Sequence, residues 1–370
     1  MSLTLARQRR ERTRELCRER GWDRLLVYGN AWRCDYLRYV SDFPILEGHG
    51  FALLERDGSV RLALESAMEA ERAGVEAPDC DVVWRPDLLA MLAAEVSDLC
   101  AAPGSRVAAA PMKLMPQAIV EAGSGRLEDA GEPFDQLMMK KSAEEIEAVK
   151  RAAAMADEGY EVFLRAARPG RAEYELTAEV EAFFRSRGVP DNFMILGSGG
   201  REVRGMHPPG DRRLAAGDLV TTELTPCVDG YYAQVCRTLV LGAPTAQQTA
   251  AFDLFRRSME AGLAALRPGV TAADVARREN DVFRAEGLGE YTTNRYTRVR
   301  GHGLGLYVDS RPALLEDVNL PLQAGMAIIV HPNTYHPDVG YVVLGDSAIV
   351  RAEGAEVLTA TPRTLFSVGG

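Results

Sequence analysis

Five histidines are the side chains in this sequence best suited to moving protons near neutral pH: His49, His207, His302, His331 and His336. An unperturbed imidazole has a pKa of about 6.5, so it can both donate and accept a proton. Two of them lie in the glycine-containing stretches RGMHPPG and GHGLG, where the backbone can approach a ligand closely. We predict catalytic roles for His207, His302 and His331. The alternative for each is a structural imidazole held by hydrogen bonds.

The stretch TTELTPCVDGYYAQVCRT, residues 221 to 238, has the pattern of a strand, a turn and a second strand. Glu223 lies at the inner end of the first strand and is the candidate base or carboxylate nucleophile. The alternative is a glutamate paired with Arg237 or with a neighbouring histidine. Cys227 and Cys236 are interpreted as small packed residues, because nothing around them indicates a lowered thiol pKa.

Polar residues next to these candidates could bind a substrate. The segment HPNTY places Asn333 and Tyr335 close after His331, where both could hydrogen-bond a carbonyl or a carboxylate. The segment NRYTRVRGH brings several arginines close before His302. Of these, Arg300 is predicted to clamp a carboxylate, although such runs are often solvated.

The elements that must position these residues contain an internal repeat. RPGRAEYELTAEVEAFFRSRG (168 to 188) and RPGVTAADVARRENDVFRAEG (267 to 287) both read as amphipathic helices that end at glycine. Each is followed by an Arg-Gly plus His element, and then by LAAGDLVTTE or LQAGMAIIVH. The two halves therefore place Glu223 and His331 at equivalent positions. We expect both in one central cleft.

The pattern before the repeat predicts a separate domain. Residues 22 to 133 alternate short apolar runs with helical stretches, which is typical of an α/β domain. Ser142 and Glu145 then form a capping box that opens a long helix. We predict domains at residues 1–138 and 139–370.

Composition narrows the range of partners. The 370 residues have a formal net charge of -10, which disfavours nucleic-acid binding, and small molecules are the expected partners. No apolar run is long enough to cross a membrane. The Arg-rich start interleaves Glu11 and Glu15 with arginines, as in a salt-bridged helix. Six irregularly spaced cysteines without a secretory signal indicate a cytoplasmic protein.

Four ordered motifs carry a resemblance to a known family: GDLVTTELTPCVDGYYAQVCRTLVLG, RGHGLGLYVDSRP, LQAGMAIIVHPN and GDSAIVRAEGAEVLT. They resemble the pita-bread peptidases, which include methionine aminopeptidase, aminopeptidase P, prolidase and creatinase, and the likeness covers residues 142 to 370. WRCDYLRYVSDF resembles the amino-terminal lobe of the prolidase and creatinase branch. The resemblance implies an α+β fold with a duplicated pita-bread domain, an α/β amino-terminal lobe and a homodimer.

The resemblance also implies where metal would bind. The metallopeptidases hold two divalent ions with Asp, Asp, His, Glu and Glu, and the matching positions here are Glu223, Gln234, His302, His331 and Gly345. We therefore predict no dinuclear centre and no required cofactor, with Gln234 assigned to substrate binding. A single divalent transition metal held by Glu223, His302 and His331 remains possible. Asp346 could partly replace the missing carboxylate, although it should point to the other face of its strand.

By resemblance to creatinase, we expect a metal-independent hydrolase of a small, non-peptide amide or amidine C–N bond. His207 matches the histidine that shuttles protons in creatinase, and His302 with His331 would orient the substrate or stabilise an oxyanion. Trp32, Arg33 and Tyr36 would close the cleft of the partner subunit. The alternatives are a mononuclear metal-dependent Xaa-Pro peptidase and a non-catalytic binding protein.

Overall fold

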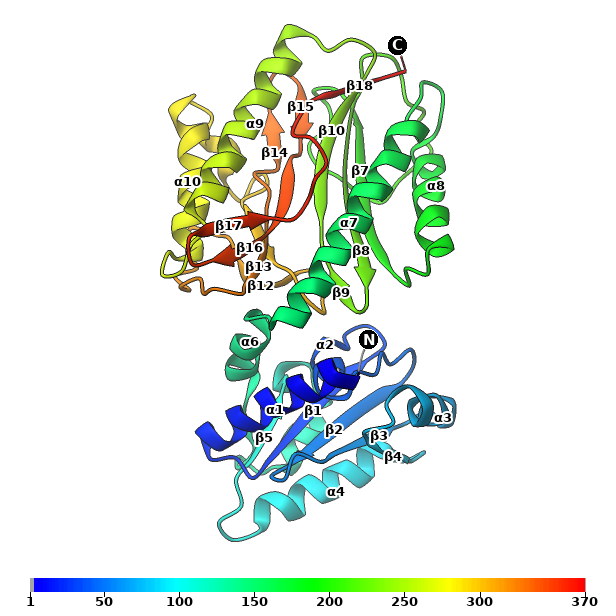
Figure 1. Cartoon of the computed structure of the whole chain (residues 1–370), viewed down its shortest axis with the longest axis vertical. Coiled ribbons are helices and arrows are strands. Elements are labelled where there is room, and N and C mark those ends of the chain that lie inside the picture. The colour runs from blue at the N-terminus through cyan, green and yellow to red at the C-terminus, as the bar shows by residue number, and fades with distance from the viewer. Residues whose placement is uncertain (1–2, 370) are drawn as a thin grey trace. The chain divides into compact units, whose positions relative to one another are not determined.

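The computed structural model describes residues 3–369, which divide into two compact units (Figure 1). The first ends at Met138 and the second begins at Met139. Each unit is described by itself. In the described part of the chain, no helix is long and apolar enough to cross a membrane.

The first unit is built on a mixed sheet of six strands in the order β4-β3-β2-β1-β5-β6. Its apolar runs form the strands that the sequence predicts, and Leu26, Phe51 and Leu92 contribute to a core between the sheet and α4. The helices of this unit are α1 (Leu3–Arg20), α2 (Asp35–Ser41), α3 (Ala67–Glu76), α4 (Leu88–Ala101), η1 (Met112–Leu114), α5 (Gln117–Ala122) and α6 (Gly131–Met139), the last of which ends at the boundary. Its strands are β1 (Arg24–Asn30), β2 (His49–Glu55), β3 (Val60–Leu64), β4 (Asp81–Trp84), β5 (Val107–Ala110) and β6 (Glu128–Asp129).

The first helix confirms the expected pattern of charge pairs, because Glu11 bonds to both Arg14 and Arg18. All six cysteines are free.

The second unit contains a larger sheet whose strand order reads as two matching halves. The helices of this unit are α7 (Ala143–Ala166), α8 (Glu173–Ser186), α9 (Ala246–Ala265), α10 (Ala272–Ala285) and η2 (Gly289–Thr292). Its strands are β7 (Asn192–Gly199), β8 (Leu219–Val228), β9 (Tyr231–Tyr232), β10 (Val235–Leu241), β11 (Gly301–Gly303), β12 (Ser310–Ala313), β13 (Ala327–Val330), β14 (Thr334–His336), β15 (Gly340–Val342), β16 (Gly345–Arg351), β17 (Gly354–Val357) and β18 (Phe366–Val368). The main path is β12-β11-β13-β16-β10-β8-β7, so β7-β8-β10 of the first half mirrors β11-β13-β16 of the second.

The predicted repeat is confirmed in the helices. Each half supplies two packed helices, α7 with α8 and α9 with α10. Ser142 begins α7 with the predicted capping box, and Thr245 and Thr271 begin α9 and α10 in the same way. The glycines that end the two repeat helices have positive φ, 76° at Gly188 and 74° at Gly287, as a left-handed cap requires. The fold is therefore the α+β pita-bread arrangement with an α/β amino-terminal domain.

The helices cover one face of the large sheet (Figure 1). Leu224 and Val235 point into the core beneath α7 and α8, while Ile328 and Val330 point into the core beneath α9 and α10. Successive residues of a strand alternate between faces, so Glu223 and Cys236 lie on the opposite side. We call this side the site face.

Candidate functional site

A row of side chains crosses the site face in register. On β10, Cys236 pairs with Glu223 of β8 on one side and with Gly345 of β16 on the other. His331 directly follows β13, and a Cβ placed on Gly345 would lie 2.7 Å from the Cβ of His331. Because neighbouring strands are about 4.8 Å apart, the Cα atoms of Glu223 and His331 are roughly 14 Å apart. Neither of the two positions between them carries a carboxylate.

Glu223 is buried at one end of this row. The Nε2 of Gln234 donates a hydrogen bond to Glu223 Oε2 at 3.0 Å, and the Sγ of Cys236 lies 3.9 Å from the same oxygen. Burial, reinforced by the negative charge of Asp309, raises the pKa of Glu223 from 4.5 to about 7. This carboxyl can therefore take up or release a proton near neutral pH. Arg237 bonds elsewhere, so the alternative of a Glu223–Arg237 pair does not hold.

His302 and His331 are both buried, and their rings meet edge to face with centroids 5.4 Å apart. The carbonyl oxygen of Gly303 lies 2.9 Å from His302 Nδ1 and can only accept, so Nδ1 carries the proton and Nε2 the lone pair. Burial lowers the pKa of both rings, that of His331 to about 3, and both are neutral at pH 7. The buried Nδ1 of His331 has no hydrogen-bond partner among the described residues.

The donors on this face do not fit two divalent ions. Gln234 offers a neutral amide, and Gly345 has no side chain at all. A larger residue at Gly345 would also collide with its surroundings, because its Cβ would lie 3.1 Å from the carbonyl oxygen of Val330 and 3.2 Å from the Cβ of Cys236. Within residues 3–369, no three His, Cys, Asp or Glu side chains gather closely enough to hold a metal ion.

Asp346 does not bind substrate, which corrects one expectation. It pairs across the sheet with Val235 and Val330, whose side chains point toward the helices, so Asp346 also points to that face. There it is 1% exposed, and its oxygens bond to Arg237 Nη2 at 2.6 Å and Arg363 Nε at 2.5 Å. Both carboxylate oxygens are therefore occupied.

Arg300 does not clamp a substrate carboxylate either. Its side chain is fully buried, and its three nitrogens donate to Asn280 Oδ1 at 2.5 Å, Asn333 O at 3.0 Å and Thr297 O at 2.7 Å. Asn333 also accepts from the backbone of Leu344 at 3.1 Å, so it supports the loop after His331. The burial that isolates Arg300 lowers its pKa to about 10.

The hydroxyl of Tyr335 donates to the carbonyl oxygen of Arg201 at 2.9 Å, so it is not a donor for substrate. Its ring is buried and packs with Cys236 and Tyr341. Tyr335 therefore contributes aromatic packing where the sequence predicted a polar contact.

His207 lies apart from this group. Its backbone pairs with Leu196 of β7, its ring is exposed, and His207 Nδ1 lies 3.2 Å from the carbonyl oxygen of Pro208. No contact joins it to Glu223 among the described residues, and its role in proton transfer stays a prediction.

The three candidates in the first unit differ in accessibility. The hydroxyl of Tyr36 is buried against Asp135, which corrects the expectation that this residue reaches substrate. Arg33 bonds to Asp35 at 2.7 Å. Trp32 is 92% exposed and is the one of the three whose whole side chain is open to a partner.

Sequence reasoning missed the aromatic residues around Tyr335. Tyr296 stacks on it, the ring of Tyr291 packs against it at a tilt, and Arg204 lies over its ring. The segment EYTTNRYTR, which holds two of these rings, carries no periodic signal that indicates where they point. Asp309, whose Oδ1 is 3.6 Å from His302 Nδ1, was missed for the same reason.

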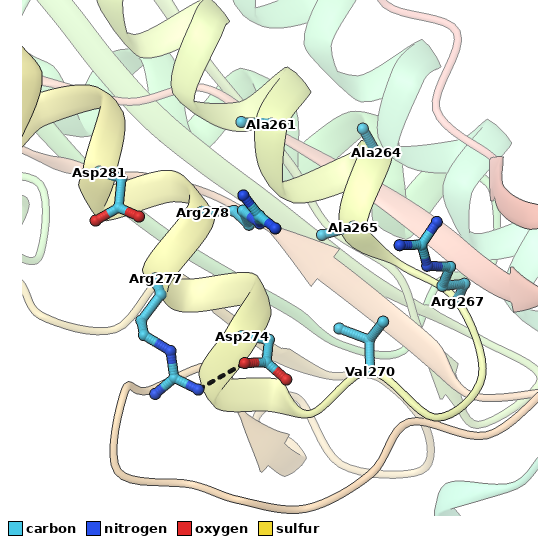
Figure 2. Close-up of a pocket in the computed structure, with 9 residues that line it drawn as sticks. All are labelled: Ala261, Ala264, Ala265, Arg267, Val270, Asp274, Arg277, Arg278 and Asp281. Atoms are coloured by element: carbon cyan, nitrogen blue, oxygen red, sulfur yellow. Dashed lines mark hydrogen bonds and ion pairs between the residues drawn. The ribbon is translucent and has the colours of Figure 1, made fainter.

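A groove of about 550 Å³ lies elsewhere, between α9 and α10 (Figure 2). Ala261, Ala264 and Ala265 line it from α9, and Asp274 and Arg277, joined at 2.6 Å, line it from α10. It contains none of the candidate site residues.

Comparisons with known proteins identify the protein family. Residues 147–352 match the metallopeptidase family M24, and residues 9–138 match the creatinase/prolidase N-terminal domain. The chain belongs to the metallopeptidase family M24.

Individual relatives agree with this assignment. The Xaa-Pro dipeptidase of Pyrococcus furiosus is 29% identical over 232 residues, which cover 62% of this chain and 66% of that protein, slightly under two thirds of its length. The solved Xaa-Pro dipeptidase from Bacillus anthracis is 25% identical with a TM-score of 0.81 and covers 98% of this chain and 100% of its own. Dipeptidase PepE from Mycobacterium ulcerans has a similar fold, with 24% identity and a TM-score of 0.83, covering all of both chains.

These relatives correct the expected reaction. They are named as dipeptidases, so they support an enzyme that hydrolyses C–N bonds. The expectation of a creatinase-like hydrolase of a non-peptide bond is wrong, because the named relatives act on peptides.

Proposed function

We propose that this chain is a hydrolase of short peptides and that dipeptides of the Xaa-Pro type are its first candidate substrates. The observation that carries the proposal is the buried carboxyl of Glu223, which has a pKa of about 7 and lies on the same face of the sheet as two neutral imidazoles. The Xaa-Pro dipeptidases among its relatives support the substrate class.

The chain's own residues supply a route for protons. Ionised Glu223 accepts a proton from the attacking water as a C–O bond forms at the peptide carbonyl. The protonated carboxyl then delivers that proton to the leaving nitrogen as the C–N bond breaks, giving a carboxylic acid and an amine. A pKa near the working pH allows one residue to perform both transfers. Gln234 holds Glu223 Oε2 in place, and His331 Nδ1 is unpartnered and can meet a polar atom of the substrate.

The chain belongs to a family of metallopeptidases, but the side chains on the site face do not fit two divalent ions. The proton transfers proposed for Glu223 do not involve a metal ion. A single ion held by Glu223, His302 and His331 is a second candidate. The unpartnered Nδ1 of His331, next to the ring of His302, favours it. Glu223 stands at the far end of the row and would have to approach the two imidazoles.

We also propose a cytoplasmic homodimer, in which Trp32 from one subunit completes the substrate site of the other. The exposure of this indole, 92%, supports the proposal. A large aromatic side chain so open to solvent is typical of a contact surface.

The test uses full-length protein purified without a tag and treated with a chelator. Ala-Pro is added, with and without Mn²⁺, Co²⁺ or Zn²⁺, and released proline is quantified. Metal content is measured on the same samples by mass spectrometry. Release of proline by the chelated protein, lost in Glu223→Gln, is the expected result. Release that requires about one added ion per chain would favour the single-ion candidate, and binding without release in every condition would refute the hydrolase.

A further inference from the structure

The groove between α9 and α10 can be compared with the same place in the first half, because the two copies of the repeat run in step. The RPG element begins at Arg168 in one copy and at Arg267 in the other, and in each case the preceding helix, α7 or α9, ends two residues earlier. The backbone of the turn is also the same, since Gly170 and Gly269 both have a φ of 86°. Differences between the two places therefore lie in the side chains.

In the first half, the charged side chains at this place bind partners close by. Arg171, just after the turn, forms ion pairs with Glu175 and Glu179 of α8. Arg168 turns back onto the end of α7 and donates from Nη1 to the carbonyl oxygen of Leu164 at 2.9 Å. Both arginines are therefore satisfied within their own half.

The second half carries a different set of charges on the same backbone. Val270 stands at the position of Arg171, and Arg278 stands at the position of Glu179. An arginine thus occupies the place of the acid, and the ion pair of the first half cannot form. Arg267 and Arg278 are both exposed, and neither forms a hydrogen bond or an ion pair with any other described residue.

The second half also has smaller side chains along the groove. Ala261 and Ala264 of α9 stand where α7 has Val162 and Arg165. Together with Ala265 they line a groove of about 550 Å³, a size typical of sites for small molecules. The groove is therefore open where the first half carries longer side chains.

The acidic residues of the groove do not neutralise its two unpaired arginines. Asp274 bonds to Arg277 at 2.6 Å, and Asp281 bonds to Arg284 at 2.9 Å. The unpaired arginines lie on either side of Ala265 (Figure 2). The groove is thus a positively charged place on a chain whose formal net charge is -10, and an anion is the ligand that its charge favours.

We propose that this groove binds a small phosphorylated metabolite, with the phosphoryl group between Arg267 and Arg278 and the organic part against the alanines. A phosphoryl group is nearly doubly charged at pH 7 and has three acceptor oxygens, so it can bind two guanidiniums that come from different elements. A carboxylate has only two oxygens in one plane, and a single guanidinium can satisfy both. The proposal is independent of the peptide hydrolase, because α9 and α10 lie on the side of the sheet opposite the site face.

Calorimetric titration of the full-length protein with phenyl phosphate tests the site, because this probe carries one phosphoryl group on a small ring. Wild type should bind it at a single saturable site in low-salt buffer, and binding should weaken as sodium chloride is added. Arg267→Gln and Arg278→Gln should each weaken binding about tenfold, the loss of one charge-assisted contact. The double substitution Val270→Arg and Arg278→Glu rebuilds the ion pair of the first half and should abolish binding.

Arg257→Gln is the matched control. Arg257 is also exposed and lies on α9, but it does not line the groove and pairs with Glu286 at 2.9 Å. This substitution removes the same charge and should leave binding unchanged, and thermal unfolding of each variant shows whether the fold is kept. Phthalate, a dicarboxylate of similar charge on the same ring, should bind about tenfold more weakly than phenyl phosphate.

No saturable binding by wild type, or unchanged binding in Arg267→Gln or Arg278→Gln, overturns the proposal. An equal loss in Arg257→Gln would show that the probe responds only to the overall charge of the protein, and equal binding of phthalate would refute the phosphate class. A loss of binding confined to the groove variants, in proteins that unfold at the wild-type temperature, supports the site.

Discussion

Replacing Glu223 by glutamine should stabilise the protein while abolishing its activity. The pKa of this carboxyl rises from 4.5 to about 7 on folding because burial disfavours the charged form. One pKa unit corresponds to about 1.4 kcal/mol, so ionised Glu223 lowers the free energy of unfolding at pH 8 by about 3 kcal/mol. Since the pKa is higher in the folded state, this destabilisation is absent below pH 4.5 and is complete once the pH has risen through 7. Glutamine stays neutral and keeps an oxygen for Gln234.

Urea unfolding of wild type and Glu223→Gln at several pH values tests the reasoning. The stability gain from the substitution should grow by about 2.5 kcal/mol between pH 5 and pH 8, because the variant lacks the titrating group. Comparing the two proteins at each pH cancels the titration of all other residues. A gain that is equal at both pH values within about 0.5 kcal/mol would refute a burial-raised pKa at Glu223. Retained release of proline by the variant would refute its role in proton transfer.

Three further substitutions test the frame and the surface around the site. Asp346→Asn should lower the free energy of unfolding by about 3–5 kcal/mol, measured by urea unfolding, because it leaves Arg237 charged in a fully buried position; a loss below about 1 kcal/mol would contradict this. Gly345→Ala should lower the free energy of unfolding by about 1–3 kcal/mol, since the new Cβ meets the Cβ of His331 at 2.7 Å. Unchanged stability would show that a methyl group fits between Cys236 and His331. Trp32→Ala should leave stability within about 0.5 kcal/mol but weaken self-association about tenfold or more in sedimentation equilibrium, and an unchanged dimer would remove Trp32 from the interface.

Local sequence signals predicted the frame of this protein well. The capping box at Ser142 and the two repeat helices ending at Gly188 and Gly287 depend on contacts a few residues apart, which the sequence displays directly. The repeat also gave the equivalence of Glu223 and His331, which stand at mirrored places in the strand order.

The site was predicted less well, because the use of a side chain depends on partners far along the chain. Arg300 looked available from sequence, but Asn280 and Asn333 take up its donors. Tyr36 is occupied by Asp135, which lies 99 residues away. No sequence pattern indicated a role for Arg204, because its position over the Tyr335 ring depends on the contact between the loop that carries Arg204 and the β14–β15 hairpin. Pattern and spacing thus located the row, but not the side chains that remain open to a ligand.

The two halves of the second unit meet at a short seam, and an ion pair behind it joins β10 to β16. Strands β10 and β16 pair through only two residue pairs, Val235 with Asp346 and Cys236 with Gly345. Directly behind the row, Arg237 bonds both to Asp346 and, through Nη1, to the carbonyl oxygen of Gly345 at 2.7 Å. Because these bonds lie on the helix side of the sheet, the alignment of Glu223 with His331 does not depend on ligands that join the two halves across the site face. A chain framed in this way presents Glu223 and His331 in register, with His302 on the neighbouring strand β11.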